Sequence, residues 1–254
     1  MSIILEAEHL TKVFTTKGKE VLKAVDDVSF QLKAGEILGI VGESGCGKST
    51  LAKLITRLTD LTSGTLIFDG KDITNLTGRE RKDFYGKIQM VFQNPLTSFD
   101  PRRTLGDGIG ESLRNRGMKK EERNRRITEV LEQAGLSAEF ADRYPHEVSG
   151  GQCQRAAIAR ALAVEPAILI CDEATSALDV TIQKQIMDLL LELKEKQGLS
   201  FIFICHNLAL VQMFCDRVLV LYDGKVAESG TTDEIINHPK EEYTKKLIAS
   251  ACES

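Results

Sequence analysis

The sequence predicts an α/β fold with a parallel sheet at its core and a helical insertion in its middle. Short apolar runs that are typical of buried strands alternate with amphipathic helical stretches along most of the chain. One of these strands, 36–41, leads directly through a glycine-rich turn into a helix, an order found in parallel α/β proteins. Between 93 and 149 the chain is polar, helical and richer in arginine, glycine and lysine, which indicates the insertion.

The predicted strands are short and are separated by turns or by helical stretches. They cover 3–9, 25–32, 36–41, 65–68, 88–92, 168–171, 201–205, 218–222 and 225–228. The predicted helices cover 49–58, 120–134, 149–164 and 182–193. In the helix 120–134, Ile127, Val130 and Leu131 share one face, and Gly135 is a natural stop after it.

Composition limits the class of protein. The 254 residues suffice for one large domain or two small ones, and a hydrophobic content of 42% supports a sizeable core. The net charge is −4 and charges of both signs are mixed, so we expect no nucleic-acid partner. The apolar runs are too short for a transmembrane helix, and the first residues lack a signal-peptide pattern.

The cysteines indicate a reducing compartment. They stand at positions 46, 153, 171, 205, 215 and 252, inside apolar or motif segments, and form no CxxC pair. We therefore expect buried free thiols of a cytosolic protein, and a disulfide or metal framework is the alternative.

The turn after the strand 36–41 carries the strongest functional signal. It comprises Gly42, Glu43, Ser44, Gly45, Cys46, Gly47, Lys48, Ser49 and Thr50. Glycines let the backbone take positive φ and come close to a ligand, and successive N–H groups then form an anion-binding concavity. The helix that begins near Lys48 adds the positive end of its dipole. The pattern is a P-loop and predicts nucleotide binding, with a chance match as the alternative.

Three side chains of this loop have predicted roles. Lys48 should reach the β- and γ-phosphates, and the Ser49 hydroxyl should hold Mg²⁺. Thr50 lies on the helix, with its hydroxyl near the α-phosphate.

A second strand ends in a pair of carboxylates, Asp172 and Glu173. Ligands of parallel sheets gather at the carboxyl ends of the strands, where the P-loop also lies. Asp172 is therefore predicted to hold Mg²⁺, directly or through water, and Glu173 to act as general base for the attacking water. The alternative is an acidic pair on the surface.

A third motif opens the helix 149–164, and it consists of Ser149, Gly150, Gly151 and Gln152. A helix N-terminus with small residues can bind an anion, and a single nucleotide does not need two such cradles on one subunit. We therefore expect this cradle to face a nucleotide on a second subunit. The alternative is an N-cap serine followed by a flexible Gly-Gly turn.

Together these motifs resemble those of the ATP-binding cassette (ABC) ATPases, and the resemblance covers nearly the whole chain. The order along the chain is P-loop, Gln93, 149–152, Asp172-Glu173, 176–179 and His206, which matches the family's Walker A, Q-loop, signature, Walker B, D-loop and switch histidine. The resemblance implies a P-loop NTPase cassette with a RecA-like parallel-sheet core and an N-terminal antiparallel β subdomain. It also implies an α-helical signature subdomain at about 94–165 and a C-terminal tail at about 229–254. Val148, Cys153 and Cys171 depart from the commonest family pattern, but they leave the phosphate-contacting positions unchanged.

The resemblance further implies that ATP is sandwiched between two subunits paired head to tail. The motif 149–152 would contact the partner's ATP, and Asp179 would reach across the dimer. Gln93 would approach Mg²⁺ and the attacking water, and His206 would bond to the γ-phosphate. Phe14 matches the aromatic residue that stacks on adenine, although it could be an ordinary core residue.

A finer resemblance points to the peptide/nickel importer branch of the family. It is carried by 41–45, 88–95, 98–102, 144–149 and a tail containing 228–230, 238–239 and 243–244. The short C-terminus resembles nickel-type and second-position peptide ATPases more than long peptide-type ones. The stretches 81–84 and 214–218 lean towards the nickel type, and a di- or oligopeptide importer is the alternative. No nickel site is expected here, because the four histidines lack ligand spacing.

In that branch the ATPase lies on the cytoplasmic face of the membrane and pairs with a second ATPase subunit, a paralogue or itself. The pair docks on two permease subunits, near 94–113 of this chain, and an extracytoplasmic binding protein delivers the cargo. Four alternatives stay open: a soluble ABC ATPase of DNA repair or translation, an importer of another substrate, an exporter ATPase, and a P-loop kinase or RecA-like motor.

Overall fold

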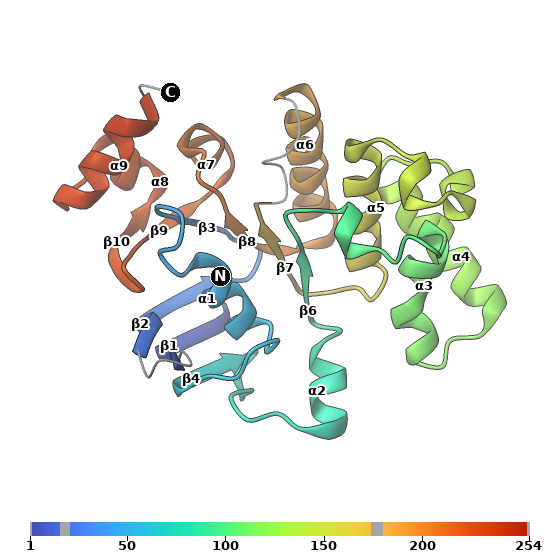
Figure 1. The fold of residues 1–254 in the computed structure, drawn as a ribbon, viewed down its shortest axis with the longest axis horizontal. Coiled ribbons are helices and arrows are strands. Elements are labelled where there is room, and N and C mark those ends of the chain that lie inside the picture. Colours follow the sequence, from blue (N-terminus) through green and yellow to red (C-terminus); the bar gives the residue numbers. More distant parts are fainter. Residues whose placement is uncertain (1, 16–20, 174–179, 253–254) are drawn as a thin grey trace. The chain divides into compact units, whose positions relative to one another are not determined.

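The computed structural model describes residues 2–15, 21–173 and 180–252, and it divides the chain into two compact units (Figure 1). The first unit combines Met1–Asp83 with Gly198–Ser254, and the second is Phe84–Gln197. Within the described residues, no helix is long and apolar enough to span a bilayer.

An antiparallel sheet forms one part of the first unit. Its strands are β1 (Ile3–Thr15), β2 (Val21–Lys33), β4 (Ser63–Phe68) and the short β5 (Lys71–Asp72), in the order β2-β1-β4-β5. The pairings β1–β2, β1–β4 and β4–β5 are all antiparallel. This sheet confirms the N-terminal antiparallel subdomain that the family resemblance implies.

Parallel pairing joins three strands of the first unit, with β3 (Ile37–Val41) in the middle. The strand β8 (Ser200–Ile204) pairs with it on one side and β9 (Arg217–Tyr222) on the other, while β10 (Lys225–Thr231) runs antiparallel to β9. Every residue of β3 and β8 is buried, as expected for strands that are covered on both faces. The helices that lie wholly in this unit are α1 (Lys48–Ile55), α7 (Leu208–Phe214), α8 (Thr232–Asn237) and α9 (Glu242–Cys252).

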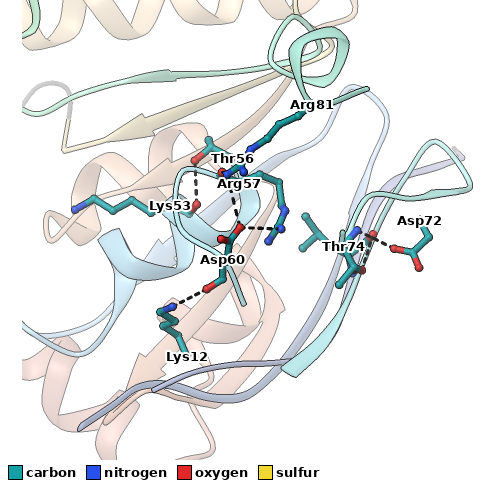
Figure 2. A network of polar contacts seen from close by, with 9 residues as sticks. Lys12, Lys53, Thr56, Arg57, Asp60, Asp72, Thr74 and Arg81 are labelled. Carbon is teal, nitrogen blue, oxygen red and sulfur yellow. Dashed lines mark hydrogen bonds and ion pairs between the residues drawn. The ribbon is translucent and has the colours of Figure 1, made fainter. Parts of the chain in front are cut away.

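A polar network fixes the chain where it leaves α1 (Figure 2). The Asp60 carboxylate accepts a hydrogen bond from Arg57 Nη2 at 3.1 Å and lies 3.6 Å from Arg81 Nη2. The main-chain carbonyl of Asp60 accepts a hydrogen bond from Lys12 Nζ at 2.7 Å. Since Lys12 belongs to β1 and Arg81 to α2 (Gly78–Phe84), the network ties the end of α1 to two other elements.

In the second unit, a pair of strands is accompanied by a group of helices. The strands β6 (Ile88–Val91) and β7 (Ile168–Asp172) are parallel. The helices are α3 (Leu105–Asn115), α4 (Lys120–Gln133), α5 (Gly150–Leu162) and α6 (Val180–Gln197), with 3₁₀ turns at Leu96–Ser98, Ala138–Asp142 and Pro145–Glu147. The segment 94–165 that we expect to be a helical subdomain lies within this unit.

Close packing explains why α3 forms despite its weak helical sequence. It contains three glycines, which lower helix propensity. A Cβ on Gly106 would lie 2.7 Å from the Ala141 carbonyl oxygen, and a Cβ on Gly108 would lie 2.6 Å from the ring of Phe99. These glycines let neighbouring segments approach, so tertiary contacts override propensity here.

The described cysteines agree with the expectation of buried free thiols. Those at 46, 153, 171, 205 and 215 are buried and form no disulfide with one another, whereas the side chain of Cys252 lies outside the described set. Burial, reinforced by the charge of Asp172, raises the pKa of the Cys171 thiol to about 12. Such a thiol is unreactive at neutral pH.

Candidate functional site: a P-loop and a carboxylate–amide pair

The P-loop connects β3 to α1 and uses glycine where the backbone needs it. Gly42, Gly45 and Gly47 have φ values of 149°, 83° and 106°. A Cβ on Gly47 would lie 2.2 Å from the Ala24 carbonyl oxygen, and one on Gly42 would lie 2.3 Å from that of Leu221. Neighbouring strands therefore enclose the loop at Gly42 and Gly47, whereas Gly45 faces open space and requires glycine only for its φ.

Lys48 turns its ammonium back into the loop. Its Nζ donates to the carbonyl oxygens of Gly42 and Glu43, both at 2.7 Å, and lies 3.8 Å from Cys46 Sγ. The residue is only 5% exposed. An ammonium has three donors, so a phosphate oxygen would need to displace only the weak thiol contact. Burial raises the pKa of the Cys46 thiol above its usual value, and the charge of Lys48 offsets only part of this rise.

The start of α1 is shaped to receive an anion. Gly47 is its N-cap in a left-handed conformation, and no side chain caps the first turn. Ser49 is exposed and Thr50 is half-buried in that turn. The first N–H groups of a helix lack partners within the helix and favour an anion at this place.

His206 lies at the same sheet edge as the P-loop, within the first unit. Ile40 of β3 pairs with Ile204 of the parallel strand β8, and Cys205 N–H donates to the Ile40 carbonyl at 3.3 Å. His206 follows, exposed, directly before Asn207, whose side chain caps α7. The histidine is thus held between the end of a buried strand and a capped helix.

The second unit brings Gln93 and Glu173 together. Val91 pairs with Cys171 in the parallel strands β6 and β7, so both functional residues stand two positions beyond the pairing. Gln93 Nε2 donates to Glu173 Oε2 at 2.6 Å. Glu173 is a non-glycine residue with φ of 48°, a left-handed conformation that costs about 1–3 kcal/mol. Asp172, the last residue of β7, is 8% exposed.

The motif 149–152 begins α5 as a reciprocal cap. Ser149 Oγ accepts from Gln152 N–H at 3.3 Å, and Gln152 Oε1 accepts from Ser149 N–H at 2.9 Å. The N-cap role that we held as an alternative for Ser149 is therefore present. The two glycines form the first turn of the helix rather than a flexible turn, and a Cβ on Gly151 would lie 2.8 Å from the Ile182 side chain.

The structure also bears on two further predicted residues. Phe14 is 40% exposed in β1, with Lys12 Nζ 5.1 Å from its ring centroid, so it is not an ordinary core residue. Its proposed stacking on adenine stays a prediction. The D-loop, 176–179 with Asp179, lies outside the described residues.

Two hydrogen bonds between the P-loop and the C-terminal part of the chain were not predicted from the sequence. Gly224 N–H donates to the Cys46 carbonyl at 3.1 Å, and the Tyr243 hydroxyl accepts from Glu43 N–H at 3.1 Å. Tyr243 is part of the tail resemblance, but its spacing to the P-loop carries no signal because 200 residues separate it from Glu43.

Comparison with known proteins identifies the family. Residues 25–176, more than half of the chain, match the ABC transporter family. The chain belongs to this family, and it is an ATP-hydrolysing cassette of the transporter class.

Several curated relatives match nearly the whole chain. The oligopeptide transport ATP-binding protein OppF of Bacillus subtilis (strain 168) is 46% identical over 97% of this chain and 82% of its own length. The di/tripeptide transport ATP-binding protein DppF of Pseudomonas aeruginosa (strain UCBPP-PA14) is 41% identical over 98% of this chain and 79% of its own.

Solved structures agree with the fold. The ATP-binding cassette MJ0796, in a dimeric post-hydrolysis state bound to ADP and Pi, is 33% identical with a TM-score of 0.82. The match covers 90% of this chain and 99% of that one. The cassette cbiO1 from Clostridium perfringens, described as part of the ABC transporter complex cbiONQ, is 28% identical with the same TM-score. Here 94% of this chain and 92% of that one are covered.

Proposed function

We propose that this chain is the ATP-hydrolysing subunit of an importer for di- or oligopeptides. The observation that carries the cargo class is the identity of 41–46% to subunits named for oligopeptide and di/tripeptide transport, over nearly the whole chain. The nickel type, which sequence features favour, receives no support from these relatives, so we propose peptide as the cargo.

The residues of the P-loop fit a nucleotide with bound Mg²⁺. Their backbone forms the cradle, and Lys48 supplies a buried positive charge at its centre. Ser49, Asp172 and Gln93 would hold Mg²⁺, whose role when bound is to neutralise charge on the phosphates. Phe14 presents an exposed ring that suits the adenine face.

Hydrolysis requires a base that takes a proton from the attacking water, and we assign this role to Glu173. Its hydrogen bond from Gln93 at 2.6 Å supports the assignment, because a charge-assisted bond fixes the position of the carboxylate. His206 would donate to the γ-phosphate and orient the water from the edge of β8.

We propose that the active form is a head-to-tail dimer in which the motif 149–152 covers the nucleotide of the partner. The dimeric state of the solved relative MJ0796 supports this arrangement. The reciprocal cap fixes Ser149 and Gln152 at the N-terminus of α5, and the N-terminus of a helix favours an anion. Asp179 would complete the contact across the dimer.

In this proposal the chain is peripheral, on the cytoplasmic face of the cell membrane, bound to two permease subunits. The permeases would dock near 94–113, and the second ATPase is a paralogue or a second copy of this chain. An extracytoplasmic peptide-binding protein would deliver cargo without touching this chain.

Affinity purification tests the assembly. A tagged chain, extracted from membranes of its own cells in mild detergent, should bring down integral membrane permeases and should hydrolyse ATP. Recovery of ribosomal or DNA-repair proteins in place of permeases would contradict the proposal and favour a soluble ABC ATPase.

A further inference from the structure

The C-terminal helix α9 contacts the start of the P-loop through one hydroxyl group. Glu43 N–H donates to Tyr243 Oη at 3.1 Å, within the first unit. Glu43 stands directly after Gly42, where φ is 149° and the chain leaves β3. The bond therefore acts at the first turn of the loop, where the chain leaves the strand.

The ring of Tyr243 is held by a second tyrosine. Its centroid lies 4.2 Å from that of Tyr222, with an angle of 41° between the ring planes. Tyr222 is the last residue of β9, next to the turn whose Gly224 N–H donates to the Cys46 carbonyl at 3.1 Å. The β9–β10 hairpin thus contacts the P-loop directly at Cys46. Through Tyr222 it also supports Tyr243, which contacts the P-loop at Glu43.

The beginning of α9 is fixed by a carboxylate of β10. Glu228 accepts hydrogen bonds from Lys240 N–H at 2.9 Å and Glu241 N–H at 3.1 Å. Burial opposes ionisation of Glu228, but these bonds, together with the Thr244 side chain and the charge of Lys240, outweigh burial and hold the pKa of the carboxyl below its usual value. The residues just before α9 are therefore clamped to the sheet, and Tyr243 follows two positions later.

We propose that Tyr243 is a positioning residue of the nucleotide site, whose hydroxyl holds the Glu43 amide and keeps the P-loop in its phosphate-binding form. Glycines at 42 and 45 make the free loop conformationally permissive, and an anion-binding concavity needs its N–H groups aligned. A contact that orders the loop in advance reduces the ordering cost of nucleotide binding. The tail thereby contributes to nucleotide affinity, independently of the cargo.

Tyr243→Phe removes the hydroxyl and keeps the ring, and Tyr222→Phe is the matched control. Tyr222 is 52% exposed, and its hydroxyl makes no hydrogen bond to the P-loop among the described residues. Binding of MgATP to the purified full chain is measured by titration, together with thermal unfolding without nucleotide. Amide hydrogen exchange at Glu43, followed by NMR, reports the bond itself.

For Tyr243→Phe we expect a dissociation constant for MgATP about three- to tenfold higher, the effect of one lost neutral hydrogen bond. Exchange at Glu43 should become faster, and the KM for ATP should rise while kcat is unchanged. Tyr222→Phe should match the wild type. Equal MgATP affinity in Tyr243→Phe and wild type, or an equal loss in both variants, would overturn the proposal. A wild-type chain that binds no MgATP would contradict the nucleotide site itself.

Discussion

Replacing Gly47 by alanine should destabilise the folded protein by about 2–5 kcal/mol. An L-residue in the left-handed region costs about 1–2 kcal/mol, and φ at Gly47 is 106°. The new Cβ would also lie 2.2 Å from the Ala24 carbonyl oxygen, whereas real Cβ contacts essentially never fall below 3.0 Å. Relief requires movement of β2 or of the loop, and overpacking of this kind costs a further 1–3 kcal/mol, roughly.

Gly45→Ala is the matched control, because Gly45 lies in the same loop with φ of 83° but has no atom within 4 Å of the Cβ position. Its cost should be the conformational term alone, about 1–2 kcal/mol. Urea unfolding of both variants and the wild type, followed by circular dichroism in the absence of nucleotide, gives the two differences in the free energy of unfolding. Equal destabilisation by the two substitutions would refute the reasoning, because it would mean that the Ala24 contact costs nothing.

Three further predictions concern catalysis, pH and packing. Glu173→Gln should bind MgATP but release phosphate about 10²–10⁴-fold more slowly, and full turnover by this variant would contradict the role of Glu173 as general base. Lys48→Ala should weaken nucleotide binding. The pKa of Glu228 is lowered in the folded protein, so its carboxylate stabilises the fold above its unfolded pKa of about 4.5, and this contribution is lost as pH falls through the folded value. Wild type should therefore have a higher thermal stability than Glu228→Gln at pH 7, and the two should converge in acid. Arg160→Ala should lower the free energy of unfolding in urea by about 2–4 kcal/mol, because the Arg160 guanidinium bonds to the Ser98 carbonyl and lies 4.5 Å from the Phe99 ring centroid. Arg102 is exposed, so Arg102→Ala should cost under about 0.5 kcal/mol. Similar losses of stability in the two variants would contradict the stabilising role of the Arg160 contacts.

The core strands and the P-loop could be predicted from sequence because their signals are local. Runs such as 168–171 are apolar throughout, and β7 duly covers Ile168–Asp172 with every residue buried. The glycines of the P-loop are needed for positive φ, and the structure has positive φ at Gly42, Gly45 and Gly47. The predicted helix 49–58 ends earlier, at Ile55, because Arg57 with φ of 56° interrupts the helical backbone.

The remaining features depend on contacts between distant parts of the chain. Helix α3 forms because Gly106 and Gly108 permit close packing, which no propensity reveals. The bond between Gln93 and Glu173 requires the register of two strands that are far apart in sequence. Local sequence likewise could not show that Tyr243 reaches Glu43, although the tail itself resembles the importer branch.

Uptake in the cells that produce this protein tests the central claim most directly. Cells in which the chain is replaced by Glu173→Gln are compared with wild type for uptake of a labelled dipeptide, a labelled oligopeptide and labelled nickel. Peptide import predicts that uptake of at least one peptide falls to background while nickel uptake is unchanged. Loss of nickel uptake with both peptides unaffected, or no loss at all, would contradict it.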